Sequence, residues 1–525
     1  MRYALAALFG ASVLLSCATP TKEQSLVSKA ADAMGGTNAL SSIKTITTSG
    51  TSKWWEPEQS DVPGGEPRFS AEGKIDAIAD VASRTTRYDY QKNFAYPTPR
   101  TFTYSEVVTP QAGYVIGIDS NGRNAESLKA NPPAHSMSGY RLATTQRERT
   151  RTAIAGLMSA MLANPDAVKP AADIAVQGRS LPAVSYQNFI VAFDPQTGLP
   201  QRVRNLDYDN IWGDVNYDSV LSDWREFGGV KIPMKRSIEL NGRVVQETQL
   251  TDVRINPPID QARLQIPAGV LANAAKPATG NVPYQWVIRR QYIGTYMDSD
   301  NVSYDAKGSP GLRLQQLSPG VFHLTGGTHN SLVVEMSDHL IVVDAPVSDS
   351  QSMWLLNTAK SQFPGKPIRW VVLTHHHMDH AGGVRGMLGE GATLVVGQGS
   401  YNHFNDVLRA PTTRNPDMKV MDLTRTPIME VAQSHLMTDS RGRQVIAYAM
   451  DNPHAKGMLM VWVPDAKLGY VTDLWNPGQP LAAKPNAGQI AVVNAVKKAG
   501  IQPERFAGGH GSVDDYQKLE KLMGQ

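Results

Sequence analysis

The sequence has almost no cysteine, since Cys17 is the only one in 525 residues. A disulfide within the chain is therefore excluded, and so is a cysteine nucleophile or metal ligand in the body of the protein. The chain also lacks an excess of charge of either sign, because 51 basic side chains face 48 acidic ones and the formal net charge is +3. With no basic stripe in the sequence, we expect no nucleic-acid partner.

Long hydrophobic runs are also missing after the first residues. The apolar run 3–15, which follows Arg2, is too short to cross a bilayer, for which ~20 residues are needed, and it predicts an export signal. It leads into Leu-Leu-Ser-Cys, which resembles a bacterial lipobox. The resemblance implies a signal peptide over 1–16, a lipid such as palmitate on Cys17 and a leash over 17–24. The alternative is an ordinary secretory signal with an incidental cysteine.

This N-terminus predicts a protein of the bacterial cell envelope that is lipid-anchored to a membrane and faces the periplasm. The residue after Cys17 is Ala18 rather than aspartate, which favours the outer membrane. The sequence specifies no oligomeric state.

Residues 25–270 have the pattern of a mainly antiparallel β domain. Apolar and polar residues alternate between clusters of Gly, Pro, Asn and Asp, and Asn241-Gly242 predicts a hairpin turn. Helical spacing predicts one helix soon after residue 24 and another over 144–164. This half resembles the curved sheets of periplasmic lipoprotein-carrier proteins, which implies a site for an apolar ligand. The alternative is a sheet that only packs against the next domain.

A second domain is predicted after a small, polar stretch that contains Pro and Gly at 272–286. We assign residues 271–317 to a linker or edge segment. From 318 to 525, short strands occur in pairs with helices before and after them, which predicts two sheets face to face with helices outside. One buried-type strand, "IRWVVLT", runs directly into "HHHMDHAGG".

The stretch "THHHMDHAGG" concentrates metal-binding side chains at the end of that strand. Residues two apart point the same way in an extended chain, so His375 and His377 can face one ion. Asp379 and His380 lie beyond, where the chain can turn toward a second ion. His376 alternates away and is interpreted as a neighbour rather than a ligand. Histidine and carboxylate ligands suit zinc or a similar borderline metal.

Three further ligand candidates lie near strand ends and small residues, namely His454, Asp473 and His510. Two neighbours have open interpretations. Lys456 either contacts an anionic substrate or is solvated, and Trp475 either lines the pocket or packs in the core. Five other histidines fit no ligand position and are expected at the surface or at strand ends: His323, His329, His339, His403 and His435, the last with a candidate place at the pocket rim.

His-x-His-x-Asp-His followed by His, Asp and His in this order resembles the metallo-β-lactamase superfamily. The resemblance covers residues 318–525 and implies an αββα four-layer sandwich, so the expected fold class is α+β, with this sandwich following the antiparallel domain. It implies two metal ions, zinc or else iron or manganese. One ion would take His375, His377 and His454, the other Asp379, His380 and His510, with Asp473 bridging them beside a water or hydroxide. Asp344, in "DHLIVVDAP", matches the structural aspartate that the superfamily has beneath the site.

The same resemblance implies a hydrolase in which a metal-bridging hydroxide attacks a small-molecule ester, lactone, thioester or amide. Asp379 would orient the hydroxide and move protons. His380, where several β-lactamase subclasses have Cys or Gln, makes β-lactam cleavage the less favoured reaction. Iron-dependent oxygen or sulfur chemistry stays open, as does non-enzymatic binding of an apolar ligand by the N-terminal domain. Specificity is expected to come from the loops at 325–330, 398–440 and 474–488.

Overall fold

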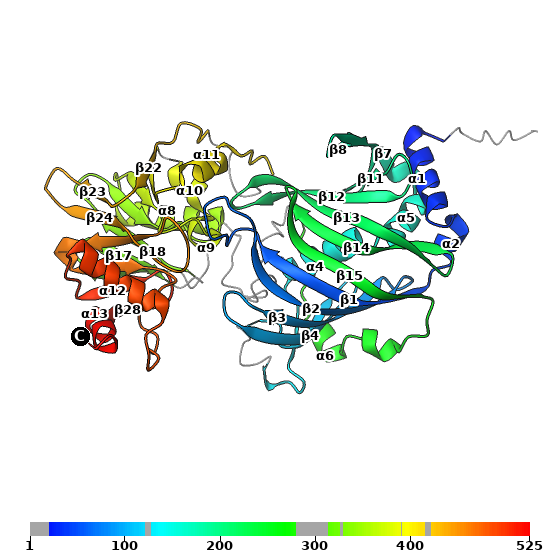
Figure 1. The fold of residues 1–525 in the computed structure, drawn as a ribbon, viewed down its shortest axis with the longest axis horizontal. Coiled ribbons are helices and arrows are strands. Elements are labelled where there is room, and N and C mark those ends of the chain that lie inside the picture. The colour runs from blue at the N-terminus through cyan, green and yellow to red at the C-terminus, as the bar shows by residue number, and fades with distance from the viewer. Residues whose placement is uncertain are drawn as a thin grey trace, which may run out of the picture.

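The computed structural model describes residues 20–120, 128–279, 313–325, 329–389, 391–414 and 422–524, which form two regions (Figure 1). The predicted signal peptide, Cys17 and the first part of the leash lie outside the described residues. Among the residues described, none of the helices has the length and apolar character needed to cross a membrane.

The N-terminal region is a thirteen-stranded sheet with the order β6-β5-β4-β3-β2-β1-β15-β14-β13-β12-β11-β10-β7. Every neighbouring pair in it is antiparallel. The strands are β1 (Thr45–Glu56), β2 (Arg68–Asp80), β3 (Thr85–Phe94), β4 (Arg100–Val108), β5 (Gly113–Gly117), β6 (Ala134–Ser136), β7 (Val168–Pro170), β10 (Ala183–Tyr186), β11 (Phe189–Phe193), β12 (Pro200–Asp209), β13 (Gly213–Phe227), β14 (Val230–Leu240) and β15 (Arg243–Ile255), with β8 (Ile174–Val176) and β9 (Arg179–Leu181) as a separate hairpin. The predicted antiparallel β domain is confirmed.

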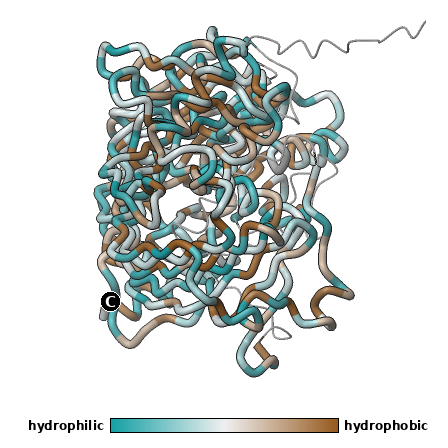
Figure 2. Tube along the Cα trace, turned by 90° about the vertical axis from the view of Figure 1, so that its right-hand side faces the viewer, coloured by the Kyte–Doolittle hydropathy of each residue, from teal (hydrophilic) through white to brown (hydrophobic). Residues whose placement is uncertain are grey.

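Helices cover the sheet where its hydrophobic residues need burial. They are α1 (Lys22–Ala33), α2 (Thr37–Ser41), α4 (Gly139–Thr152), α5 (Ile154–Ala163) and the short α6 (Ala268–Leu271). The single helix predicted over 144–164 is wrong, because Ala153, with φ −96° and ψ 66°, separates α4 from α5. Figure 2 shows hydrophobic and hydrophilic residues interspersed along the trace, as expected for strands with one buried face.

Between α4 and the sheet lies a buried group of charges, which we call the N-terminal charge cluster: Lys92, Glu106, Asp119, Arg141 and Arg149. The Arg141 guanidinium donates to Asp119 Oδ2 at 2.6 Å and to Glu106 Oε1 at 2.8 Å. Arg149 donates to Glu106 Oε2 at 2.6 Å. The Lys92 ammonium lies over the Trp54 ring, 4.5 Å from its centroid. Each charge therefore faces a partner within the cluster or an aromatic ring.

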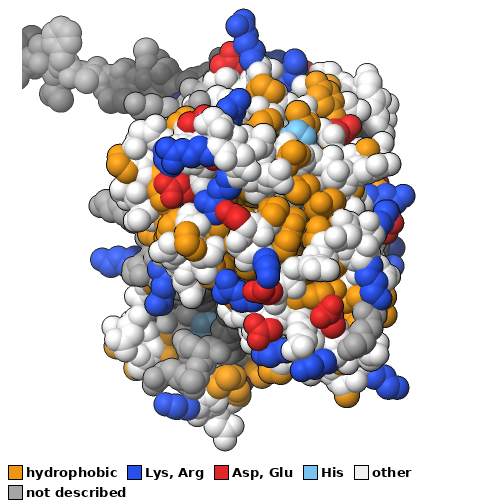
Figure 3. Space-filling model, turned by 90° about the vertical axis from the view of Figure 1, so that its left-hand side faces the viewer, with side chains coloured by type: hydrophobic (Ala, Val, Ile, Leu, Met, Phe, Trp, Pro, Cys, Tyr) orange, Lys and Arg blue, Asp and Glu red, His pale blue; other side chains and the backbone are white. Residues whose placement is uncertain are grey.

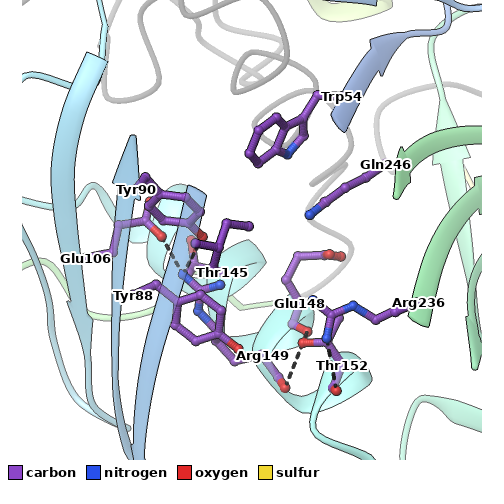
Figure 4. Close-up of a pocket in the computed structure, with 11 residues that line it drawn as sticks. Trp54, Tyr88, Tyr90, Glu106, Thr145, Glu148, Arg149, Thr152, Arg236 and Gln246 are labelled. Carbon is purple, nitrogen blue, oxygen red and sulfur yellow. Dashed lines mark hydrogen bonds and ion pairs between the residues drawn. The ribbon is translucent and has the colours of Figure 1, made fainter. Parts of the chain in front are cut away.

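A small cavity beside this cluster is one place where the predicted apolar ligand could be considered. Figure 4 shows its lining, in which Arg149 from α4 reaches Tyr88 and Tyr90 of β3, and Trp54 of β1 closes another side. The cavity has about 40 Å³ of space for water-sized molecules, which is room for one or two waters. This cavity is too small and too polar to take a lipid chain.

The C-terminal region contains two sheets. The first has the order β16-β17-β18-β19-β20-β21-β22 and the second β23-β24-β25-β26-β27-β28. Their strands are β16 (Arg313–Ser318), β17 (Val321–Thr325), β18 (Ser331–Glu335), β19 (Leu340–Val343), β20 (Ile368–Val372), β21 (Thr393–Gly397), β22 (Ile428–Val431), β23 (Ser434–Thr438), β24 (Gln444–Ala449), β25 (Leu459–Val463), β26 (Leu468–Val471), β27 (Arg505–Gly508) and β28 (Val513–Asp515). The segment predicted as linker or edge thus ends in an edge strand, β16.

Hydrophobic packing stacks these sheets into layers. One core lies between the sheets and includes Val334 and Val372 of the first sheet with Val461 of the second. The first sheet's other face packs on α8 (Asp349–Gln362), α10 (Val384–Leu388) and α11 (Tyr401–Arg409), and the second sheet's other face packs on α12 (Ala487–Ala499) and α13 (Tyr516–Leu522). The predicted αββα sandwich is confirmed. On the face of this region in Figure 3, basic and acidic side chains are interspersed.

Candidate metal centre

The predicted ligand stretch follows β20 and enters the one-turn helix α9 (Met378–Ala381). Asp344, directly after β19, fixes this turn from below. Its carboxylate accepts hydrogen bonds from the Thr374 backbone N–H at 2.7 Å and hydroxyl at 2.9 Å, and from His380 Nδ1 at 3.0 Å. Because Nδ1 of His380 donates to Asp344, its Nε2 is the nitrogen free to bind an ion.

His375, His377 and His454 form the first ligand group. Their ligand atoms all lie within 4.8 Å of one another. His454 reaches the group from the loop between β24 and β25, and its Nε2 faces His377 Nδ1 at 3.0 Å. The structure therefore brings together a residue from the end of β20 and one more than seventy positions later.

Asp379, His380 and His510 form the second ligand group, also within 4.8 Å of one another. His510 follows β27 in a glycine-rich loop, and its Nε2 lies 3.3 Å from His380 Nε2. Asp473 stands between the two groups. Its Oδ1 lies 3.0 Å from His510 Nε2, and its Oδ2 lies 3.0 Å from His380 Nε2 and 3.5 Å from His375 Nε2.

The backbone at Asp473 has φ +58°, a left-handed conformation that costs a non-glycine residue energy. Strain of this kind persists only where surrounding contacts fix it. Here the turn after β26 directs the Asp473 carboxylate between the two groups of imidazoles. The strained backbone is therefore what places this carboxylate within reach of both groups.

Electrostatics in the centre favour a cation. Burial alone would raise the pKa of Asp473, but the imidazoles of His380, His510 and others hold it well below its usual range. Burial alone would lower the pKa of His380, but Asp473, Asp379 and Asp344 raise it far above its usual range. The same three carboxylates that stabilise a proton on His380 would stabilise a metal ion in its place.

The donor set fits the metal that the sequence implies. The Nε2 atom of His375 is buried and makes no hydrogen bond within the described residues. The ring nitrogens of His377 and His454 face each other at 3.0 Å, a separation that needs a proton or a cation between them. Imidazole nitrogens and carboxylate oxygens that converge in this way suit a zinc-like ion.

One histidine was missed by the sequence analysis. His329, expected at the surface or a strand end, lies in the centre, with its Nε2 3.3 Å from Asp379 Oδ2 and its ring centroid 4.6 Å from that of His510. Burial lowers the pKa of His329 to about 4. No spacing in the sequence relates this single loop histidine to the other ligands.

The other residues that the sequence singled out lie outside the two ligand groups. His376 makes a hydrogen bond to the Ser60 carbonyl and belongs to neither ligand group. Trp475 is buried in the core beneath α12, and Lys456 is exposed. The surface or strand-end placement is also wrong for two other histidines that are buried inside elements, His323 in β17 and His403 in α11.

Comparison with known proteins agrees with this geometry. A family model described as the metallo-beta-lactamase superfamily matches residues 324–510, a span that contains both ligand groups and Asp473. The C-terminal domain belongs to the metallo-beta-lactamase superfamily.

Individual relatives each match less than half of the chain. A linear primary-alkylsulfatase from Pseudomonas sp. is 33% identical over 79 residues, which are 14% of this chain and 12% of that enzyme's length. The solved structure of the sec-alkylsulfatase Pisa1 from Pseudomonas sp. has 16% identity and a TM-score of 0.31, covering 41% of this chain and 40% of its own. A metallo-beta-lactamase from Pontibacter korlensis has 18% identity and a TM-score of 0.32, covering 40% of this chain and 97% of its own.

Proposed function

We propose that this protein is a metal-dependent hydrolase with a dinuclear centre, formed by the two ligand groups and bridged by Asp473, that acts on a small-molecule ester, lactone, thioester or amide. The observation that carries the proposal is the convergence of two ligand groups on one shared carboxylate. Zinc is the metal that best suits the donor set, with iron or manganese as the alternatives.

Each carboxylate of the centre has a separate role in the proposed reaction. Bound divalent ions would supply Lewis-acid activation of water and of a substrate oxygen. Asp473 neutralises charge between the two groups, and Asp344 holds His380 so that Nε2 points into the site. Asp379 stays ionised, because the neighbouring histidines hold its pKa well below its usual range although burial opposes this. An ionised Asp379 would orient the attacking water through a hydrogen bond that its carboxylate accepts, and transfer of the water's proton toward the leaving group through Asp379 is part of the proposal.

Metal analysis and a substrate screen test this proposal together. Purified protein should hold about two transition-metal ions per chain, and hydrolysis should disappear with a chelator and return with Zn²⁺. Less than one tightly bound ion per chain would contradict the proposal. Iron in the purified protein together with oxygen uptake would replace it with oxidative chemistry.

Sulfate esters are the second candidate substrate class, because the 79-residue match is to a protein named as an alkylsulfatase. The screen should therefore include alkyl sulfates beside β-lactam, lactone, thioester and phosphoester probes. Release of inorganic sulfate, with no turnover of carboxylic esters, would establish this class over the first.

We also propose that the mature chain is attached to a membrane through a lipid on Cys17 and faces the periplasm. The support is the lipobox-like sequence that ends at the chain's only cysteine. Cells fed labelled palmitate should label the wild-type chain but not Cys17→Ser, and the variant should move from the membrane fraction to the soluble fraction. Equal labelling of both would contradict the anchor.

A further inference from the structure

The loop between β1 and β2, residues 57–67, leaves the N-terminal sheet and reaches the metal centre; we call it the crossing loop. Figure 1 shows it in blue, extending toward α9. Three consecutive polar residues in it, Glu58, Gln59 and Ser60, are at most 5% exposed. Loops usually run over the surface, and buried polar groups need partners. Several partners of this loop lie in the superfamily domain.

At the first ligand group, the crossing loop faces His377. The backbone carbonyl of Ser60 lies 2.9 Å from Nε2 of His377. A carbonyl can only accept, so Nε2 carries the proton and Nδ1 is left to face His454 Nε2 at 3.0 Å. The N-terminal region thereby sets which nitrogen of His377 is available to an ion.

At the second ligand group, the crossing loop faces Asp379. Gln59 Nε2 donates to Asp379 Oδ1 at 2.8 Å, while Asp379 Oδ2 lies 3.3 Å from His329 Nε2. The Tyr96 hydroxyl, from the turn between β3 and β4, donates to Gln59 Oε1 at 2.5 Å. A carboxylate only accepts hydrogen bonds, so the NH2 end of the Gln59 amide must face Asp379. The Tyr96 hydroxyl fixes that orientation by donating to the oxygen end.

The crossing loop is also tied to the segment that carries His454. Arg68, at the start of β2, donates to the Asp61 carboxylate and, at 3.0 Å, to the His454 carbonyl. The backbone N–H of Lys456 donates to the Asp61 carbonyl at 2.9 Å. The contacts of Gln59, Ser60, Asp61 and Arg68 with Asp379, His377, Lys456 and His454 join the N-terminal region to segments that carry ligands. None of these four residues is itself a predicted ligand.

We propose that the crossing loop is a positioning element of the metal centre, in which Gln59 orients the Asp379 carboxylate and the Ser60 carbonyl orients His377, so that the two regions form one active site. This inference rests on the proposed function, because it concerns how the proposed ligands are held. Asp344, which holds His380, belongs to the superfamily domain, whereas the N-terminal region supplies the groups at His377 Nε2 and Asp379 Oδ1.

The test uses full-length protein with Gln59→Leu, which removes both side-chain hydrogen bonds at similar volume. Its matched control is Gln146→Leu, because Gln146 Nε2 also donates to carbonyls, but within the N-terminal region. We expect Gln59→Leu to lower the affinity of one of two metal sites by about 10–100-fold, since groups that orient metal ligands have effects of this size. Gln146→Leu should keep both affinities. The readouts are metal titration and the absorption spectrum of the Co²⁺-loaded protein.

A second variant keeps the proposal testable if Gln59→Leu does not fold. Tyr96→Phe removes only the hydroxyl that fixes Gln59, and it should weaken the same site less, with the same spectral change. Tyr186→Phe, which removes a hydroxyl that bonds to the Ala160 carbonyl, is its control. Two-ion binding with wild-type affinity and an unchanged Co²⁺ spectrum in both test variants would overturn the crossing-loop proposal. A wild-type protein that binds no metal would instead contradict the proposed function.

Discussion

The two regions each bury a group of charged and polar side chains, and the groups differ in what their atoms face. In the N-terminal charge cluster, each guanidinium faces a carboxylate, as Arg141 faces Glu106 and Asp119. In the metal centre, ring nitrogens face one another, as His377 faces His454 and His380 faces His510. A guanidinium and a carboxylate neutralise each other, whereas two ring nitrogens that face each other need a proton or a cation between them. Burial alone therefore does not distinguish a structural cluster from a functional one.

The largest effect should come from removing the shared carboxylate of the metal centre. Asp473→Ala leaves the imidazoles of both ligand groups without the anion between them, so bound metal should fall from about two ions per chain to less than one. Elemental analysis of dialysed protein measures this. Retention of both ions would show that Asp473 does not bridge the groups.

The complementary variant in the N-terminal charge cluster is Arg141→Met. It leaves the buried carboxylates of Glu106 and Asp119 without their main partner, so the free energy of unfolding should fall by ~3–5 kcal/mol. Metal content of the folded protein should not change. Urea denaturation measures the loss, and Arg225→Met, in an exposed pair with Asp223, should change stability by less than ~0.5 kcal/mol. Loss of metal in Arg141→Met would contradict the distinction between a structural N-terminal charge cluster and a functional metal centre.

The buried Lys92 ammonium of the N-terminal charge cluster predicts that stability depends on pH. Burial lowers its pKa to about 7, compared with about 10.4 in an unfolded chain. Between these two pKa values the unfolded state binds more protons than the folded state, so the free energy of unfolding should rise with pH. The cost of burying the charged ammonium is fully present below pH 7 and disappears toward pH 10. From pH 7 to 9 the wild type should gain ~2 kcal/mol relative to Lys92→Met. Parallel stability curves for the two proteins would contradict this.

His329→Ala should have the smallest effect of the four. Its Nε2 contacts Asp379 but the ring is not needed to complete either predicted ligand group, so affinity for the weaker-bound ion should fall about 10-fold, which is ~1.4 kcal/mol. Competition with a chromophoric chelator measures this, with His435→Ala as the control histidine. A loss as large as that of Asp473→Ala would make His329 a principal ligand.

Part of the centre could be predicted from local geometry, whereas the roles of His454, Asp473 and His510 toward two ions were implied by the resemblance to the metallo-β-lactamase superfamily. Alternation along an extended chain separates His376 from His375 and His377, and the ends of neighbouring strands bring His454, Asp473 and His510 to the same edge. The αββα layers likewise follow from paired strands with flanking helices. His329 was missed because a single histidine in a loop has no spacing that relates it to the other ligands.

The contacts of the crossing loop could not be predicted for a different reason. Gln59 and Asp379 are 320 positions apart, and neither the loop's composition nor its spacing marks it as part of a site. Which loop of one region meets which turn of the other depends on how the regions pack, and sequence periodicity contains no information about that. The break between α4 and α5 is similar, because Ala153 carries no glycine or proline signal.

The thirteen-stranded sheet has a consequence for how this protein behaves at high concentration. Among the described residues this sheet has two edge strands, and an edge strand that is exposed can pair with another molecule and begin aggregation. Both edge strands, β6 and β7, are only three residues long. β7 ends in Pro170, which has no N–H to donate, and Lys169 adds a charge beside it. Short, interrupted edges allow the chain to carry an extended sheet with little risk of growth from molecule to molecule.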